Sequence, residues 1–152
     1  MEGPDSKLSA LWTQVVVELD ARMVRQRDGG SVETLGDIAE NIVSAVLAVG
    51  RFEDGGTGVA RCEARVGPSF PADSSRILVL ARAVDELAED ELRAVLIREF
   101  FCGFVLYQEG PEHFLEQTRE ERDEEVDDWM RDLGFEAEAD LVESLCGGWR
   151  PP

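Results

Sequence analysis

Residues 89–107 of the chain read EDELRAVLIREFFCGFVLY. The stretch opens with three acidic residues, which stabilise the positive N-terminal end of a helix. From Leu92 to Tyr107, apolar residues then occupy almost every face of a helix, the pattern of a helix surrounded by protein. Gly110 and Pro111 break the pattern directly afterwards. We therefore expect one long helix that forms the buried centre of the fold.

Two helices are predicted before this stretch. Apolar residues from Leu8 to Met23 recur at helical spacing, and this helix is expected to end near Asp28-Gly29-Gly30. Ser31 is a candidate cap for a second helix, whose apolar positions run from Leu35 to Leu47 and whose stop is Gly50.

Two strands are predicted between the second helix and the central helix. Residues 60–66 alternate apolar and charged side chains, which is typical of a half-exposed strand. Residues 76–81 form a short continuous apolar run, which indicates a strand covered on both faces. The predicted sheet is therefore small.

An acidic segment follows the central helix and ends at Asp132. Gly134 then suits a left-handed helix cap, with Phe135 folded back on the preceding turn. A last helix is expected over residues 136–146. The sequence thus predicts a mixed α/β (α+β), helix-rich single domain over residues 1–146 with a small β-sheet, and a flexible tail over residues 147–152.

Composition narrows the classes of partner. The 15 basic and 33 acidic residues give a net charge of −18, which repels nucleic-acid phosphates and anionic membrane surfaces. There is no signal-peptide pattern and no apolar run of the ~18–20 residues that a membrane span needs, so the expected compartment is the cytoplasm. The single lysine, Lys7, among the basic residues hints at a GC-rich bacterial source.

The cysteines do not indicate a structural cross-link or a zinc ribbon. Cys62, Cys102 and Cys146 are odd in number, lie far apart and form no C-x-x-C pair. Reduced thiols are expected for a cytoplasmic protein, with Cys102 as a small buried apolar residue.

The central stretch contains Arg98-Glu99-Phe100-Phe101-Cys102-Gly103, which resembles the active-site helix of zincin-like metallopeptidases. In that family the helix reads H-E-x-x-H-G: two His one turn apart bind a zinc ion, and the Glu acts as general base on the metal-bound water. In this chain the Glu is present as Glu99, whereas Arg98 and Cys102 stand at the two His positions.

A second segment, residues 123–135, resembles the downstream helix that supplies the third metal ligand in gluzincins. In one register Asp123 stands at the position of the metal ligand, and Asp127 stands at the position of a residue that contacts the ligands rather than the metal. A register one residue later uses Glu124 and Asp128. The sequence alone does not choose between the two registers.

The departures from the pattern imply loss of the metal site. A guanidinium stays protonated and cannot bind zinc, and Cys102 with one carboxylate beside a fixed positive charge is a poor ligand set. The resemblance thus implies a catalytically inactive pseudo-metallopeptidase with Glu99 as a vestigial base and no metal or other cofactor. The expected role is protein binding or regulation, with a cleft that still accepts a peptide along an edge strand.

A more specific hypothesis concerns the position and the partner of Arg98. It is expected to occupy the vacated metal position and to pair with Asp123 or Glu124, so that a cation still joins the two helices. The alternative is that Arg98 extends to solvent and pairs with a nearby carboxylate such as Glu91.

Other candidates have simpler interpretations. The only histidine, His113, is expected at the surface or as a cap, and the aromatics of the central helix are expected in the core: Phe100, Phe101, Phe104 and Tyr107. Residues 109–132 hold 11 carboxylates and three arginines, which favours a solvated helix face, with docking of a basic partner as the alternative.

Two other functions remain open. One is a metal-dependent hydrolase that uses Glu99 with an unusual ligand set. The other is an acidic binding protein similar to bacterial secretion chaperones, which work as dimers and usually have more strands than the two predicted here.

Overall fold

The predicted central helix is present as α4 (Glu89–Glu109). The computed structural model describes residues 3–26, 32–52, 58–65, 68–69 and 74–148. Every residue of α4 from Leu92 to Leu106 is buried except Arg93 and Arg98. The helix ends at Gly110, whose φ of +89° favours glycine because it has no Cβ. The prediction of a long buried helix with this stop is confirmed.

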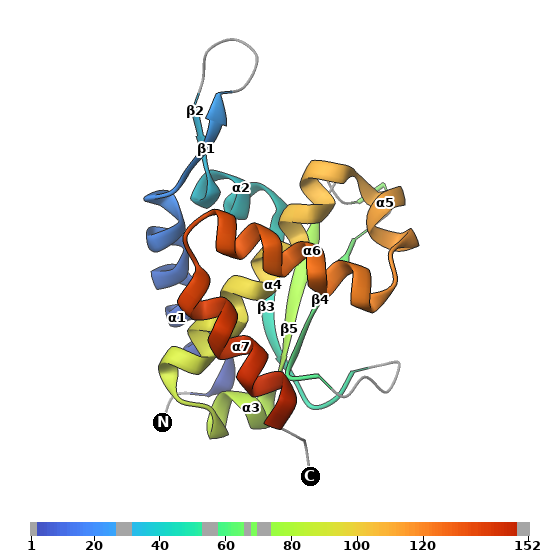
Figure 1. Cartoon of the computed structure of the whole chain (residues 1–152). Helices are drawn as coiled ribbons and strands as arrows, with labels where there is room; N and C mark the ends of the chain where they lie inside the picture. Colours follow the sequence, from blue (N-terminus) through green and yellow to red (C-terminus); the bar gives the residue numbers. More distant parts are fainter. Residues whose placement is uncertain (1–2, 27–31, 53–57, 66–67, 70–73, 149–152) are drawn as a thin grey trace.

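A three-stranded sheet packs against α4 (Figure 1). Its strands are β3 (Val43–Val49), β4 (Ala60–Ala64) and β5 (Ser75–Leu80), in the order β3-β5-β4. β5 lies in the middle, parallel to β3 and antiparallel to β4. Consecutive residues of β5 from Ile77 to Leu80 are buried, so both faces of this strand are covered, as predicted.

The first helix is shorter than expected. α1 (Pro4–Asp20) buries the predicted stripe of Leu8, Leu11, Val15 and Leu19. It does not continue to Asp28, because β1 (Met23–Gln26) follows and pairs antiparallel with β2 (Val32–Thr34). Asp-Gly between two short strands is also a hairpin signal, and cross-strand pairing outweighed the helical spacing here. The hairpin projects from the body of the molecule, and residues 27–31 lie outside the described residues (Figure 1).

The predicted second helix is wrong in its second half. α2 (Leu35–Ile42) ends where β3 begins. Its cap is Thr34, whose hydroxyl accepts the Asp37 N–H at 3.1 Å, while the expected cap Ser31 lies outside the described residues. A short apolar run fits both a helix and a strand, and the parallel pairing of β3 with β5 favours the strand.

The remaining helices are α3 (Ala81–Glu86), α5 (Pro111–Glu116), α6 (Arg119–Asp132) and α7 (Glu136–Gly148). Gly134 adopts a φ of +91°, and the N–H of Phe135 donates to the Met130 carbonyl at 2.7 Å, so the predicted left-handed cap is confirmed. α7 includes Gly147 and Gly148, which were expected in the tail, and residues 149–152 lie outside the described residues.

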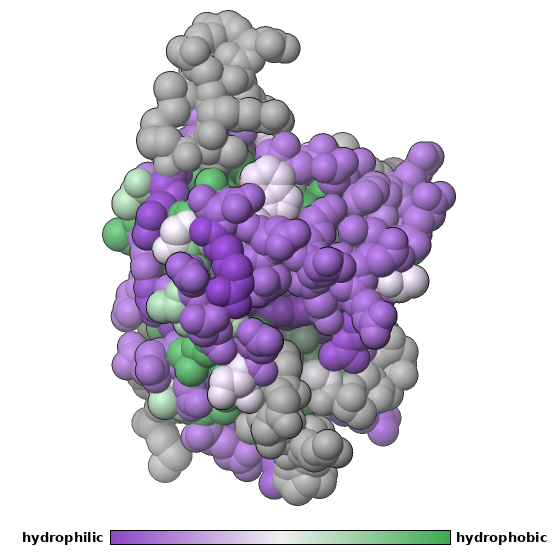
Figure 2. Space-filling model, in the orientation of Figure 1, coloured by the Kyte–Doolittle hydropathy of each residue, from purple (hydrophilic) through white to green (hydrophobic). Residues whose placement is uncertain are grey.

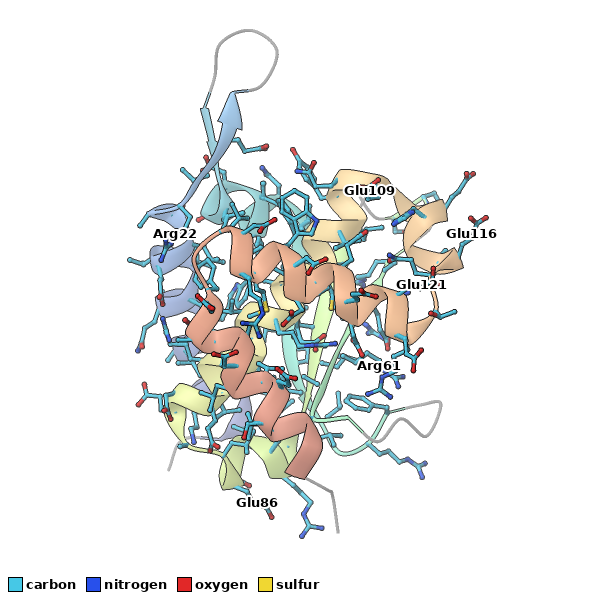
Figure 3. All side chains as sticks on the ribbon, in the orientation of Figure 1. Arg22, Arg61, Glu86, Glu109, Glu116 and Glu121 are labelled. Carbon is cyan, nitrogen blue, oxygen red and sulfur yellow. The ribbon has the colours of Figure 1, made fainter. Side chains whose placement is uncertain are left out.

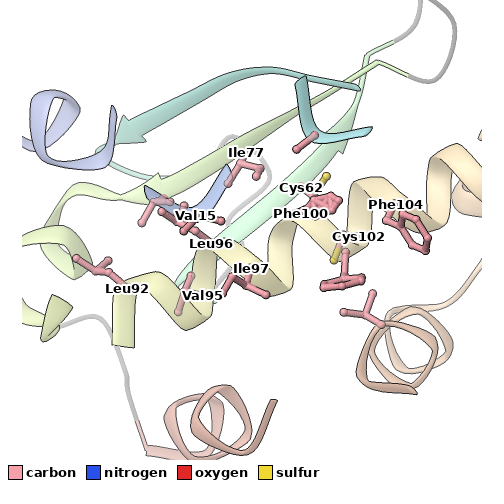
Figure 4. Close-up of a cluster of buried hydrophobic side chains, with 14 of the residues drawn as sticks. Val15, Cys62, Ile77, Leu92, Val95, Leu96, Ile97, Phe100, Cys102 and Phe104 are labelled. Carbon is pink, nitrogen blue, oxygen red and sulfur yellow. The ribbon is translucent and has the colours of Figure 1, made fainter. Parts of the chain in front are cut away.

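α4 lies between the sheet on one side and α6 and α7 on the other (Figures 1 and 4). Its aromatic side chains join those of α6 and the turn before α7 in edge-to-face contacts, with Phe104 and Trp129 at 4.9 Å between ring centroids. Phe100, Phe101 and Phe104 are fully buried, which confirms their assignment to the core. The chain is thus a single α+β domain with a small sheet and a helical core.

The face that carries α6 and α7 is mainly hydrophilic (Figure 2). This agrees with a solvated acidic face on residues 109–132. Among the described helices, none is long and apolar enough to span a bilayer.

Candidate functional site

Arg98 connects α4 to α6. Its guanidinium bonds to the carboxylate of Glu99 through Nη1 and to that of Asp123 through Nη2. Nη1 also lies 3.9 Å from Sγ of Cys102, one helical turn further along α4. The three positions that resemble a metal-ligand set, 98, 102 and 123, therefore converge on one point, which is occupied by a guanidinium.

The predicted ion pair between Arg98 and α6 is confirmed, and Asp123 rather than Glu124 supplies the carboxylate. The alternative partner of Arg98 is wrong. The side chain of Glu91 accepts the backbone N–H of Ala88 at 2.8 Å and so caps the start of α4.

The guanidinium is a permanent cation at this point. Burial lowers the pKa of Arg98, but Glu99, Cys102 and Asp123 together raise it above its ordinary range. The side chain of Glu99 is only 3% exposed, and its carboxylate bonds to this cation. The carboxylate of Glu99 thus faces a fixed cation.

Arg98, Glu99 and Asp123 form what we call the Arg98 cluster. Two buried thiols lie beside it, Cys62 on β4 and Cys102 on α4, and both are held in the protonated form. Burial, with a contribution from Glu99, raises the pKa of Cys102 to about 12, against the lowering effect of Arg98. Burial and the neighbouring Cys102 and Glu99 raise the pKa of Cys62 well above its ordinary value. Neither thiol has the thiolate character of a metal ligand or a nucleophile at neutral pH.

A cleft of about 500 Å³ opens beside Arg98. It lies between β4, α4, α5 and the start of α6. Its lining residues are Phe52, Gly58, Ala60, Arg61, Cys62, Glu63, Ala64, Arg98, Glu99, Cys102, Leu115, Arg119, Arg122 and Asp123. All five residues of β4 thus line the same cleft as the Arg98 cluster.

β4 is an edge strand, and its outer backbone groups can be assigned. Val59 accepts a hydrogen bond from Leu80, and Arg65 donates one to Ser74, so the backbone groups of both residues face β5. In an antiparallel pair, alternate residues direct their N–H and C=O groups to opposite sides. The backbone groups of Ala60, Cys62 and Ala64 therefore point away from β5, on the edge where another strand would pair.

At the opposite edge of the sheet, formed by β3, a side chain binds an outward-facing backbone group. A carboxylate oxygen of Asp5, on α1, accepts the backbone N–H of Ala48 on β3 at 3.0 Å. A side chain that satisfies an edge N–H obstructs strand addition there.

The other predicted residues lie away from the cleft. Glu124 and Asp127 line a second cavity of about 330 Å³ between α4, α6 and α7, to which Arg98 and Asp123 also contribute. Asp127 accepts a hydrogen bond from Arg131 at 2.9 Å rather than contacting Arg98. His113 is part of α5, and its Nε2 lies 3.2 Å from Glu125 on α6, with the side chain 42% exposed. The surface assignment of His113 is confirmed.

Sequence reasoning missed the arginines of the cleft, Arg61, Arg119 and Arg122. Arg61 lies on the side of the molecule where α6 begins (Figure 3). A signal was present: Arg119 and Arg122 are three residues apart within the acidic segment, so on a helix they share one face. That the same cleft also receives Arg61 depends on the packing of β4 against α4.

Within the described ranges, no group of three or more His, Cys, Asp or Glu side chains is arranged to hold a metal ion. The chemistry of positions 98 and 102 does not suit a metal either, because they carry a guanidinium and a protonated thiol. No protein-family model, curated protein or solved structure matches the chain.

Proposed function

We propose that this protein is a catalytically inactive, zincin-like protein that binds an extended segment of a partner protein along β4. One observation carries the proposal: the outward edge of β4 and the Arg98 cluster line a single cleft. An edge strand beside a helix with a degenerate metal-ligand pattern is the arrangement expected of a former peptidase that keeps its peptide-binding surface.

The loss of catalysis is supported by the Arg98 ion pairs. A metal ion at this point would balance the charges of Glu99 and the acidic residue on α6. Arg98 supplies that positive charge permanently, and it offers neither a lone pair for a metal nor an open position for a water. The general base therefore has no activated water on which to act.

Peptide binding is supported by the backbone of β4. Three alternate residues of β4, Ala60, Cys62 and Ala64, present outward-facing N–H and C=O groups at the spacing of a strand. Five strand residues span roughly 17 Å at ~3.3 Å per residue, which suits a bound segment of similar length. Main-chain pairing of this kind supplies affinity without requiring one particular sequence.

Selection of peptides tests the proposal directly. Random dodecapeptides displayed on phage are selected on the wild-type protein, and the enriched peptides are then measured against Ala60→Pro. This change removes an N–H that faces the cleft and leaves the bonds from Val59 and Arg65 to the neighbouring segment in place. Ala60→Ser is the matched control because it keeps the N–H, and thermal unfolding checks that each variant is folded.

We expect enriched peptides to lose about tenfold in affinity with Ala60→Pro, the effect of one unmade backbone hydrogen bond, and to bind Ala60→Ser as they bind wild type. The peptides should also stay intact during long incubation. Equal binding to Ala60→Pro and wild type contradicts strand pairing. Cleavage that disappears in Glu99→Gln contradicts the loss of catalysis and favours the hydrolase alternative.

A further inference from the structure

We infer that the segment bound along β4 is acidic, with carboxylate side chains that face Arg119 and Arg122. This inference rests on the proposed strand-binding function and names the chemistry of its ligand. The partner is thus a protein segment rich in Asp or Glu, although the chain itself carries a net charge of −18.

The sign of the charge reverses inside the cleft. The chain has 33 acidic and 15 basic residues, whereas the lining of the cleft contains four arginines and three carboxylates. Cations contact all three carboxylates: Arg98 bonds to both Glu99 and Asp123, and Arg76, outside the lining, pairs with Glu63 at 3.1 Å. By formal charge the lining of the cleft is therefore slightly positive, on a chain that is strongly acidic.

Arg119 is the arginine best placed to meet a ligand. Its side chain is 76% exposed, and its ion pair with Asp123 is long at 3.9 Å. Asp123 is at the same time bound by Arg98 through its other oxygen. A Cβ built on Gly58 would lie 3.6 Å from Nη2 of Arg119, so this guanidinium reaches the start of β4. A ligand carboxylate can form a shorter contact with Arg119 than Asp123 does.

Successive side chains of a strand point to opposite faces of the sheet, and this rule predicts where the side chains of the ligand lie. A strand paired with β4 directs every second side chain to the face of Ala60, Cys62 and Ala64, which packs on α4. Arg119 and Arg122 of α6 line the same cleft as this face. The side chains between them project toward the face of Arg61, whose guanidinium stacks 4.5 Å from the ring centroid of Phe52. Carboxylates on the bound strand thus meet arginines.

Three octapeptides with blocked ends test the inference: alternating Glu-Val, alternating Gln-Val and alternating Lys-Val. Blocked ends ensure that side chains are the only source of charge. Attraction governed by the net charge of the protein favours the Lys peptide. The cleft predicts the opposite order, with the Glu peptide about fivefold tighter than the Gln peptide at physiological ionic strength and the Lys peptide weakest.

Arg119→Gln provides the residue-level test. We expect it to weaken the Glu peptide about fivefold and to leave the Gln peptide unchanged. Arg82→Gln is the matched control: Arg82 is also an exposed helical arginine, 59% exposed, with a long i,i+4 partner, Glu86 at 3.8 Å, and it does not line the cleft. A Glu peptide that binds no better than the Gln peptide, or that is insensitive to Arg119→Gln, overturns the inference.

The same measurements separate this inference from the proposed function. If Ala60→Pro weakens the Gln peptide but the Glu peptide has no advantage, strand binding stands and the acidic preference is wrong. If the Glu peptide binds but Ala60→Pro has no effect, the acidic ligand is not held as a strand, and both proposals fail.

Discussion

Arg98 on α4 forms an ion pair with Asp123 on α6, 25 residues further along the chain. A guanidinium thus joins the two helices, at the point where the proposed zincin-like interpretation would place a metal ion. Four predictions follow from this cluster and from the packing of α4 around it.

The first prediction concerns the stability that depends on Arg98. In Arg98→Gln the carboxylate of Glu99, which is 3% exposed, loses its cation. We expect the free energy of unfolding to fall by about 3 kcal/mol, because an uncompensated buried charge is costly. Urea unfolding measures this loss.

Two further variants serve as controls for the stability of Arg98→Gln. Arg82→Gln removes an exposed arginine with one i,i+4 partner and should change stability by less than about 0.5 kcal/mol. Arg98→Gln/Glu99→Gln removes the unpaired charge as well and should recover part of the loss. An Arg98→Gln effect as small as that of Arg82→Gln would show that the cluster contributes little.

The second prediction concerns alkaline pH. The pKa of Cys102 is about 12 in the folded protein, against about 8.5 for an exposed thiol. As the pH rises, the unfolded chain releases this proton first, so the contribution of Cys102 to stability is complete below about pH 8 and declines from about pH 9 to pH 12.

Unfolding by urea in the presence of a reductant, at pH 8 and at pH 10, measures this decline. Between these two values the wild type should lose about 1–2 kcal/mol more than Cys102→Ala, which has no thiol to titrate at this position. Equal losses in the two proteins would mean that Cys102 titrates normally in the folded state.

The third prediction concerns the geometry of the proposed degenerate metal site. Arg98→His/Cys102→His places two imidazoles one turn apart on α4, beside Asp123. We expect this variant to bind Zn²⁺ stoichiometrically, and Zn²⁺ at ~100 times its Kd should stabilise it by about 2.7 kcal/mol. Elemental analysis and thermal unfolding with Zn²⁺ or a chelator provide the measurement.

The controls for this prediction are the wild type and Arg98→Gln/Cys102→Ser, neither of which should be stabilised by Zn²⁺. If the double His variant is also insensitive to Zn²⁺, the three positions do not form a ligand set and the zincin-like interpretation loses its main support. A tightly bound metal in the wild type would instead favour the hydrolase alternative.

The fourth prediction concerns the contact between α4 and the sheet. A Cβ on Gly103 would lie 2.9 Å from Oγ of Ser75, which donates a hydrogen bond to the Ile42 carbonyl at 3.2 Å. Gly103→Ala should therefore cost about 1–2 kcal/mol, because crowding outweighs the better helix propensity of Ala.

Making Gly103→Ala in a protein that already carries Ser75→Ala tests whether crowding against the Ser75 hydroxyl causes this loss. With the hydroxyl gone, Gly103→Ala should be neutral or stabilising relative to Ser75→Ala alone. Urea unfolding of the four proteins gives the coupling between the two positions. Stabilisation by Gly103→Ala in both backgrounds would show that α4 does not approach the sheet as closely as described.

Several boundaries were predictable because neighbouring residues decide them. The acidic start and apolar body of α4, its end at Gly110 and the left-handed cap at Gly134 all depend on local chemistry: charge near the helix dipole, a missing Cβ, and a run of apolar residues. The resemblance that pointed to Arg98 and Asp123 is likewise a pattern of spacing along single helices.

The segments that differ from prediction depend on partners far away in the sequence. Val43–Val49 is an apolar run that suits either a helix or a strand, and only pairing with Ser75–Leu80 makes it β3. Met23 has helical spacing with Leu19, but backbone bonds to β2 place it in a strand.

The sequence by itself therefore determined the buried central helix, two strands of the sheet and the spacing that places Arg98 and Cys102 one turn apart on α4. The tertiary structure alone decided that Asp123 rather than Glu124 meets Arg98, because adjacent helical residues point about 100° apart and the crossing of α4 and α6 selects one of them. It alone also brought Arg61 and Arg119 to one cleft along the edge of β4. The physical reason is that helix caps and burial patterns are local, whereas a cleft is defined by how separately specified elements pack.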